Sequence, residues 1–300
     1  MTSNFKALEA SEVDGNFSLN IVEKNTKDLP EGDLLVKVNF SSLNYKDAMS
    51  ATGLPGVTRK YPHTPGIDAV GEIAESISEE FKEGDKVIIS GYDLGMNTSG
   101  GFAEYVRVPS QWAVILPKGL SQKNAMALGT AGLTAGLSIE ALDSFRGVKD
   151  TKSIVTGATG GVGSIAVMLL SQLGSEVTAL SGKQDQQDFL IETLGAFSVM
   201  AREDLLKSVR RPINKGLWDI GVDVVSGEVL STLLAALNPG GAIACCGLVG
   251  GTSFNSSIFP FILRGTALLG IDSVEIPINS KKEIWENFGN SWSLDGLDKI

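Results

Sequence analysis

A glycine-rich turn in the middle of the chain has the residue pattern with the clearest chemical meaning. Residues 152–163 read KSIVTGATGGVG, in which a short apolar segment leads into the turn, and an apolar helical run follows over 164–173. Glycine lets a pyrophosphate approach bare backbone, because no Cβ blocks it. The N–H groups that open the following helix then face the anion, and the helix dipole favours negative charge there. The strand–turn–helix order therefore predicts a dinucleotide site.

The end of the next predicted strand indicates which dinucleotide binds. An NAD site usually places a carboxylate here, on the ribose 2′-hydroxyl. This strand ends in LSGK, and no acidic residue appears before Asp185. Ser181 can donate to a 2′-phosphate and Lys183 can pair with it, whereas a carboxylate would repel it. Taken alone, Lys183 is more simply explained as a solvated residue at a helix start. Next to the glycine turn it favours NADPH.

Composition excludes several other classes of protein and site. The net charge is −10 and the sequence pI about 4.7, which is unfavourable for general nucleic-acid binding. His63 is the single histidine, and the two cysteines, Cys245 and Cys246, are adjacent in an apolar run, so a His/Cys zinc site and a disulfide framework are not expected. The N-terminus lacks an apolar signal core, and no apolar run is long enough to span a bilayer. These features predict a cytoplasmic protein without membrane partners.

The elements that must position the turn follow from apolar periodicity. Residues 1–120 are rich in short β-like segments, at 34–40, 69–74, 86–90 and 103–108, separated by glycine turns. A packed helix is expected over 124–142. Strands and helices then alternate, with strands at 153–156, 176–180, 220–225, 242–246 and 268–271 and helices at 163–173, 186–194 and 228–237. The alternation predicts an α/β fold whose doubly wound parallel sheet collects its ligand loops at one edge.

Several stretches together resemble the medium-chain dehydrogenase/reductase superfamily. They resemble most closely its zinc-free quinone-oxidoreductase branch and, within that branch, the acryloyl-CoA reductase group. The matching stretches are SSLNYKDAM (41–49), TPGIDAVGEI (64–73), GGFAEYVRV (100–108), GTAGLTA (129–135), VTGATGGVG (155–163), LSGK (180–183), ACCGLVGG (244–251) and PFILRG (260–265).

This resemblance implies a GroES-like, β-rich catalytic domain over 1–120 and a Rossmann domain over 121–271, with the active site in the cleft between them. Residues 272–300 would return toward the catalytic domain. Family members normally continue further, so the chain is expected to be truncated there. Zinc members carry Cys and His ligands where this chain has Asn44 and Ile67–Asp68, and the resemblance therefore implies no metal.

The resemblance places Asn44 and Tyr45 facing the nicotinamide. A phenol is protonated at neutral pH, so Tyr45 can donate a hydrogen bond to a substrate carbonyl or a proton to the adjacent carbon. Asn44 can orient amide or carbonyl groups. The alternative is that Tyr45 is a half-buried wall residue and that Lys46 and Asp47 form a surface pair.

The resemblance also assigns residues to the cofactor and the substrate. Thr130 and Thr134 would lie beside the nicotinamide, although Thr130 could equally cap a helix. The other cofactor contacts expected are Thr159, Gly160, Gly161, Val162, Gly247, Leu248, Phe261 and Leu263, with core packing nearly as good an explanation for Phe261 and its neighbours. Apart from the resemblance, Arg59 and Lys60 form a local basic pair in an acidic protein, which could hold coenzyme A phosphates or be ordinary charges of an exposed loop. Arg264 could reach a phosphate or a partner subunit.

These residues predict an NADPH-dependent reductase of activated C=C bonds, with an enoyl thioester such as acryloyl-CoA as substrate. Quinone reduction by the same site is the alternative among enzymes. An NADPH-binding structural or regulatory protein with little turnover is the alternative outside them. A homodimer is expected, formed through the run 242–247 and the edge strand 268–271, as in family dimers.

Overall fold

The computed structural model describes residues 3–208 and 211–300. The chain divides into two compact units. The first comprises residues 1–130 together with 273–293, and the second comprises residues 131–272 together with 294–300. Helix α2 (Gln122–Phe145) runs from the first unit into the second. Each unit has a sheet and a hydrophobic core of its own, and each is described below by itself.

The first unit is built on an antiparallel five-stranded sheet of order β6-β3-β4-β5-β7. Its elements are β1 (Asn4–Val13), β2 (Asn16–Asn25), β3 (Leu34–Phe40), α1 (Tyr45–Thr52), β4 (Asp68–Ser76), β5 (Lys86–Ser90), β6 (Tyr105–Val108), β7 (Ala113–Ile115), α7 (Ile278–Gly289) and the 3-10 turns at Thr26–Asp28 and Ser110–Trp112. Apolar residues alternate along the strands, as Leu34 and Val36 do in β3, and pack into one core.

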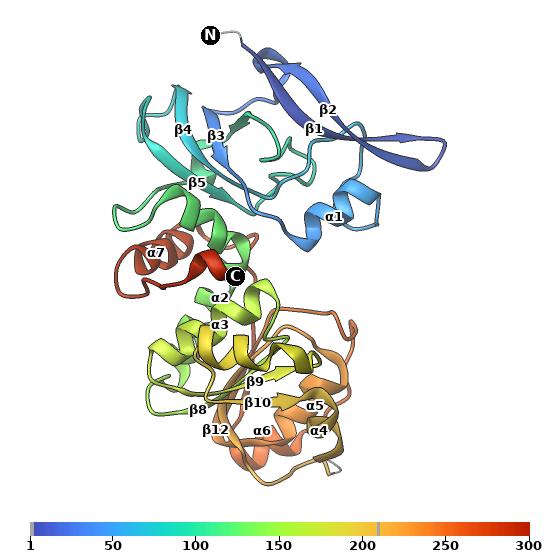
Figure 1. Cartoon of the computed structure of the whole chain (residues 1–300), viewed down its shortest axis with the longest axis vertical. Coiled ribbons are helices and arrows are strands. Elements are labelled where there is room, and N and C mark those ends of the chain that lie inside the picture. The colour runs from blue at the N-terminus through green and yellow to red at the C-terminus, as the bar shows by residue number, and fades with distance from the viewer. Residues whose placement is uncertain (1–2, 209–210) are drawn as a thin grey trace. The chain divides into compact units, whose positions relative to one another are not determined.

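Strands β1 and β2 form a long hairpin that contacts α1 (Figure 1). Asp14 and Gly15 connect them, both with positive φ (51° and 78°), as a two-residue type I′ turn requires. The sequence analysis places no strands here, although an Asp-Gly pair between alternating segments is a hairpin signal. Strand β7 is also absent from the predicted set. The other four strands of the sheet lie within two residues of their predicted bounds.

The second unit contains a six-stranded parallel sheet of order β10-β9-β8-β11-β12-β13, flanked by helices (Figure 1). Its elements are β8 (Lys152–Thr156), α3 (Gly161–Gln172), β9 (Glu176–Ser181), β10 (Ser198–Ala201), α4 (Arg202–Ser208), β11 (Trp218–Asp223), α5 (Gly227–Ala235), β12 (Leu237–Cys245), α6 (Phe259–Arg264), β13 (Ala267–Gly270), 3-10 turns at Gln184–Gln186 and Leu297–Lys299, and a π-helical turn at Phe189–Thr193. In order along the chain, the strands are arranged 3-2-1-4-5-6, which is the dinucleotide-binding topology.

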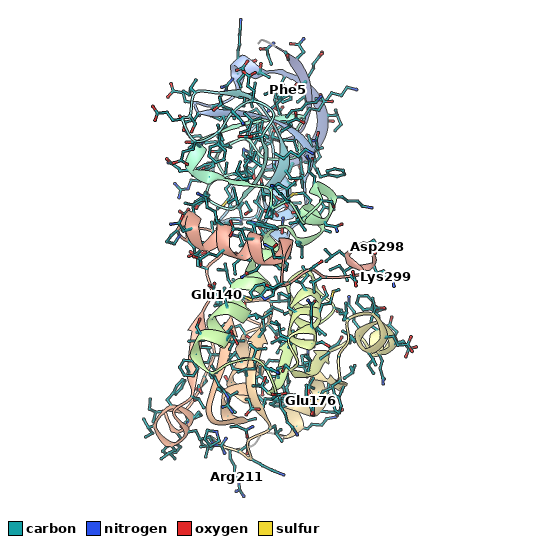
Figure 2. All side chains as sticks on the ribbon, turned by 90° about the vertical axis from the view of Figure 1, so that its left-hand side faces the viewer. Phe5, Glu140, Glu176, Arg211, Asp298 and Lys299 are labelled. Carbon is teal, nitrogen blue, oxygen red and sulfur yellow. The ribbon has the colours of Figure 1, made fainter. Side chains whose placement is uncertain are left out.

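The parallel sheet confirms the predicted doubly wound fold and brings the carboxyl ends of its strands to one edge. Glu176, labelled in Figure 2, is the first residue of β9 and marks the opposite, amino edge. The short strand β10 is missing from the predicted set. The helix predicted over 186–194 is instead a 3-10 turn followed by the π-helical turn, in which the Leu194 N–H donates to the Phe189 carbonyl five residues earlier.

Helix α2 is long and apolar enough to cross a membrane, which the sequence analysis did not expect of any segment. It bends at Gly129, whose φ of 50° and ψ of −153° are not helical. Within its most apolar window, 72% is buried inside the protein, which is typical of a core helix. The structure therefore explains the apolar run by packing.

Candidate functional site

The predicted glycine turn follows β8 and exposes backbone at its tip. Gly160 caps the amino end of α3 and, like Gly161, is exposed, while Thr159 and Val162 are half-buried. A Cβ on Gly163 would lie 2.2 Å from the Gly157 carbonyl oxygen, so this position must be glycine for the helix to start against the turn. The turn thus presents unobstructed N–H groups at a helix amino end, as a phosphate site requires.

Ser181 and Lys183 lie at the carboxyl end of the neighbouring strand, β9. Ser181 is buried, and its Oγ accepts a hydrogen bond from the Lys183 N–H at 3.0 Å. This bond fixes the backbone at the strand end, and the Lys183 side chain is exposed beyond it. The nearest acidic residue along the chain, Asp185, lies in the following 3-10 turn rather than at the strand end.

A buried carboxylate that the sequence analysis missed organises the ends of β8 and β11. Asp223 is fully buried and accepts hydrogen bonds from Thr156 Oγ1 at 2.7 Å and from the Ser226 N–H at 2.8 Å. Burial raises the pKa of its carboxyl, and these hydrogen bonds partly offset the rise. The sequence offers one indication of this residue: Asp223 is an acid at the end of a mostly apolar strand.

The loop after β12 packs tightly on this arrangement. A Cβ on Gly247 would lie 2.0 Å from the Val224 carbonyl oxygen, so glycine allows the two loops to touch. The next residue, Leu248, is 63% exposed at the same edge of the sheet. Burial raises the pKa of the thiols of Cys245 and Cys246, which precede Gly247, and that of Cys246 to about 12. A reactive cysteine is therefore disfavoured here.

Helix α6 contains three of the residues considered for ligand contacts, Phe261, Leu263 and Arg264. Phe261 packs against the buried core of the second unit, whereas Leu263 is 65% exposed. The guanidinium of Arg264 donates to the main-chain carbonyls of Leu237, at 2.5 Å, and of Asn214. Arg264 therefore serves the fold of its own unit, which neither predicted role, a phosphate contact or a subunit contact, describes.

In the first unit, Asn44 caps α1, and Tyr45 is the first residue of that helix. Tyr45 is 76% exposed, so it is not a half-buried wall residue. Asp47 is buried rather than part of a surface pair, and its carboxylate accepts from the N–H groups of Asn44 (2.7 Å), Gly66 (3.1 Å) and Ile67 (2.9 Å). Burial raises the pKa of this carboxyl. Asp47 thereby ties the start of α1 to the loop before β4.

Asp68 gathers predicted site residues around a second carboxylate. Its Oδ2 accepts from the Asn44 side-chain amide at 2.9 Å and from the Thr130 N–H at 2.8 Å, and its Oδ1 accepts from Thr130 Oγ1 at 2.7 Å. Ser42 Oγ also donates to Oδ2. The structure thus brings Asn44 and Thr130 together, whereas the sequence analysis noted Asp68 only as a residue at a zinc-ligand position.

The remaining predicted residues lie apart from this cluster. Arg59 and Lys60 are exposed in the loop after α1. His63 is buried, with Nε2 2.9 Å from the Gly95 carbonyl oxygen, and burial lowers its pKa. In the second unit Thr134 is buried, one helical turn beyond Thr130. Ala131 lies against the start of α3, because a Cβ on Gly161 would be 3.1 Å from the Ala131 Cβ.

Two family profiles match the chain in the order of these units. Residues 30–118 match the alcohol dehydrogenase GroES-like domain, and residues 161–288 match the zinc-binding dehydrogenase family. The acrylyl-CoA reductase AcuI of Ruegeria pomeroyi is 38% identical over 99% of this chain and 90% of its own length.

The chain belongs to the medium-chain dehydrogenase/reductase superfamily.

Within this superfamily the chain falls in the group of quinone oxidoreductases and acrylyl-CoA reductases. The crystal structure of the YhdH oxidoreductase of Salmonella enterica in complex with NADP is 41% identical, with a TM-score of 0.91 over 96% of this chain and 89% of that one. The YhfP protein of Bacillus subtilis, provisionally named a quinone oxidoreductase, was crystallised with NAD. It is 40% identical, with a TM-score of 0.96 over 99% of this chain and 91% of that one.

The residues at the superfamily's zinc position do not fit a zinc ion. Zinc needs ligands with a free lone pair, such as thiolate, neutral imidazole or carboxylate. Here Asn44 and Thr130 direct donors at the one carboxylate, Asp68, and the neighbouring Ile67 is apolar. Across residues 3–208 and 211–300, no group of three His, Cys, Asp or Glu side chains could hold a metal ion.

Proposed function

We propose that this member of the superfamily is a zinc-independent, NADPH-dependent reductase of activated C=C bonds, with an acryloyl-CoA-like enoyl thioester as its substrate. The observation that carries the cofactor choice is the end of β9, where Ser181 and the exposed Lys183 stand and no carboxylate does. The similarity to the acrylyl-CoA reductase AcuI over nearly the whole chain supports the substrate class.

The second unit supplies the groups that would hold NADPH. The N–H of Gly161, at the start of α3, suits the pyrophosphate, and Thr159 and Val162 flank it. Gly160 contributes a close approach without a Cβ, because its own N–H donates to the Gly157 carbonyl at 2.9 Å. Ser181 and Lys183 suit the 2′-phosphate, because a hydroxyl can donate to it and an ammonium can pair with it. Gly247, Leu248, Thr134, Phe261 and Leu263 complete the proposed cofactor contacts, together with Thr130 of the first unit.

Bound NADPH supplies a hydride for the β-carbon of the unsaturated thioester. Negative charge develops on the thioester oxygen, where a hydrogen-bond donor would stabilise it. The Asn44 amide nitrogen already donates to Asp68 and Ser42, so it is a poor donor for this oxygen. The exposed Tyr45 hydroxyl is therefore the proposed donor, either of that hydrogen bond or of the proton that completes reduction.

Metal assistance is not needed for this chemistry, because an enoyl thioester is already electrophilic at its β-carbon. The hydrogen-bond donors that surround Asp68 support zinc independence, because they occupy its carboxylate oxygens and offer a metal no lone pairs of their own. Arg59 and Lys60 are the proposed contacts for coenzyme A phosphates, because they form an exposed basic pair on an acidic protein.

A steady-state assay of NADPH oxidation tests the proposal. The purified enzyme is offered acryloyl-CoA, small quinones and saturated propionyl-CoA, with NADPH or NADH, before and after treatment with a chelator. We expect turnover to be fastest with acryloyl-CoA and NADPH and unchanged by the chelator. Faster turnover of quinones would instead favour quinone reduction, the activity in the name given to YhfP. Tight NADPH binding without turnover of any acceptor would favour a structural or regulatory protein.

We further propose that the enzyme is a homodimer joined through β13. This strand ends the parallel sheet, so one of its edges has no strand beside it among the described residues. The other predicted segment, 242–247, begins within β12, which lies between β11 and β13 and so has no open edge. The adjacent helix α6 exposes Ile258 and Ile262, and an apolar surface beside an open strand edge suits a second copy of the chain.

A further inference from the structure

The cluster around Asp68 joins three separate segments of the first unit. Asp68 is the first residue of β4, Ser42 and Asn44 precede α1, and Thr130 follows the bend in α2. The Asp68 side chain is fully buried. Its two oxygens accept four hydrogen bonds, one each from Ser42 Oγ, Asn44 Nδ2, Thr130 N and Thr130 Oγ1. A single side chain therefore connects all three segments.

The bend in α2 is shaped to make this arrangement possible. At Gly129 a Cβ would lie 2.5 Å from Ser42 Oγ and 2.9 Å from Asp68 Oδ2, and the φ of 50° disfavours any other residue. The bend turns the Thr130 N–H away from the helix and toward the carboxylate. The local backbone thus accommodates Asp68 at the cost of continuous helical geometry.

Asp68 also fixes which face of the Asn44 amide is available. A carboxylate oxygen can only accept hydrogen bonds, so the Asn44 nitrogen must face Asp68. Ser42 Oγ lies 3.2 Å from the same nitrogen. The Asn44 backbone N–H is held at the same time by Asp47. Two buried carboxylates therefore hold Asn44, one through its side chain and one through its main chain, directly before Tyr45.

We propose that Asp68 is a positioning residue for the reductase. It holds Asn44 and Thr130, and through Asn44 the start of α1 with Tyr45, in the geometry that turnover needs. In zinc members, ligands converge on a cation at the corresponding positions. Here hydrogen-bond donors converge on the Asp68 carboxylate instead, and these hydrogen bonds hold the segments in place as metal–ligand bonds would. This inference rests on the proposed function, because it assumes that Asn44, Tyr45 and Thr130 face the reaction.

The test compares Asp68→Asn with a matched control and a rescue variant. Asp68→Asn preserves shape but replaces one acceptor oxygen by a donor, which faces the donors of its neighbours. Asp33→Asn is the control, since Asp33 also accepts from a main-chain N–H and a hydroxyl, both of Ser110, in the same unit. The double variant Asn44→Asp with Asp68→Asn returns one carboxylate and one amide to the pair in exchanged positions.

The expected result is a fall in kcat by about a hundredfold for Asp68→Asn, as misplacement of a reacting group by ~1 Å can produce. The NADPH dissociation constant, measured by cofactor fluorescence, should rise far less than kcat falls, because Thr130 is only one of several proposed cofactor contacts. The exchange variant should recover at least part of kcat, and Asp33→Asn should keep it. An unchanged kcat in Asp68→Asn, or an exchange variant no better than Asp68→Asn, would overturn the proposal.

A milder variant covers the case in which Asp68→Asn does not fold. Ser42→Ala removes one of the four donors at a residue outside the proposed contacts with cofactor and substrate. We expect it to lower kcat severalfold without changing the midpoint of thermal unfolding by more than a few degrees. An unchanged kcat in this variant counts against the proposal.

If the unchanged enzyme reduces no acceptor, the proposed function has failed and activity cannot judge Asp68. A crystal structure of Asp68→Asn, or of Ser42→Ala if the former does not fold, then decides. Displacement of Asn44 and Thr130 relative to β4 supports the positioning role, and residues that stay in place refute it.

Discussion

Lys183 is the residue to which the proposed function assigns the choice between NADPH and NADH. Its ammonium lies on an exposed side chain just after β9, and the bond from its N–H to Ser181 Oγ fixes the backbone at that point. The relatives show that both dinucleotides occur in this group, since one was crystallised with NADP and another with NAD. The shared fold therefore does not decide between them, and the proposed function assigns the discrimination to the side chains at this strand end.

Replacing Lys183 by Ala should raise the KM for NADPH about tenfold to a hundredfold, the loss of one charge-assisted hydrogen bond to phosphate. The KM for NADH should change little, because NADH has no 2′-phosphate. Steady-state kinetics with both cofactors measure the difference. Lys207→Ala, at another exposed lysine of the same unit, is the control and should leave both constants unchanged. Equal effects of Lys183→Ala on both cofactors would contradict phosphate recognition.

Tyr45 tests the assigned proton donor. Tyr45→Phe removes only the hydroxyl and should lower kcat for the thioester by roughly 10²–10⁴-fold if that hydroxyl acts as the general acid. NADPH binding should persist, because the proposed cofactor contacts lie elsewhere. Tyr105→Phe serves as the comparison, since Tyr105 stacks edge-on against Phe5 in β1. If Tyr45→Phe keeps its full rate, the proton comes from another source such as water.

At the scale of elements, β3 and β5 have the bounds that the sequence predicts, and α3 begins two residues before its predicted start. Of the parallel strands, β8, β9, β11 and β13 lie within two residues of their predicted bounds, because apolar runs separated by glycine turns carry a strong local signal, whereas β12 begins five residues before its predicted start. The hairpin β1–β2, with polar residues on its exposed strand, lacked such runs, and the π-helical turn has no local signal of its own.

The carboxylates around the candidate site could not be predicted in the same way. Asp47, Asp68 and Asp223 each accept hydrogen bonds from residues in other segments, some more than 60 positions away. Nothing local in the sequence distinguishes Asp47 or Asp68 from a solvated acid, whereas Asp223 has one signal, its place at the end of a mostly apolar strand. Asp47 was therefore placed on the surface, whereas the fold buries it. Local sequence therefore does not indicate which acids connect distant segments of the fold.

Gly163 tests the packing of α3 against the turn. Gly163→Ala places a Cβ about 2.2 Å from a main-chain oxygen, and backbone cannot yield as a side-chain end can. We expect loss of NADPH binding and a lower free energy of unfolding, by about 1–3 kcal/mol. Calorimetry and chemical denaturation measure the two effects. Gly270→Ala, at the end of β13, is the matched control, because nothing lies within 4 Å of its added Cβ and it lies outside the proposed cofactor contacts. A Gly163→Ala variant that binds NADPH normally would refute this requirement.

At the scale of the whole molecule, His63 should make stability depend on pH. Burial lowers its pKa below the usual 6.5, the charge of Lys24 adds to this, and the Gly95 carbonyl and Asp93 oppose it. The unfolded chain therefore takes up a proton on this side chain at a higher pH than the folded chain does. Stability is unaffected above the unfolded pKa and falls as pH drops below it.

The measurement is the free energy of unfolding between pH 7.5 and 5 for the native chain and for His63→Asn. As the pH falls, the native chain should lose more stability than the variant. The buried carboxyls of Asp47 and Asp223 have raised pKa values and act in the opposite direction, but they are common to both proteins and cancel in the difference. Identical pH dependence in both proteins would exclude His63 as the sensitive group.

The oligomeric state follows from how the second unit ends its sheet. Strand β13 is the last strand, and Ile262 on the preceding helix α6 is 64% exposed. Two copies that pair through β13 would cover both features at once, because α6 leads directly into the strand.

Light scattering should therefore give a mass twice the 31.6 kDa of one chain. Ile262→Glu places a charge in the contact and should shift the mass toward that of one chain, whereas Val13→Glu, at a residue that is 67% exposed on the hairpin of the first unit, should not. A native protein that is monomeric at micromolar concentration refutes the dimer, and a dimer that survives Ile262→Glu excludes the surface beside β13 as its interface.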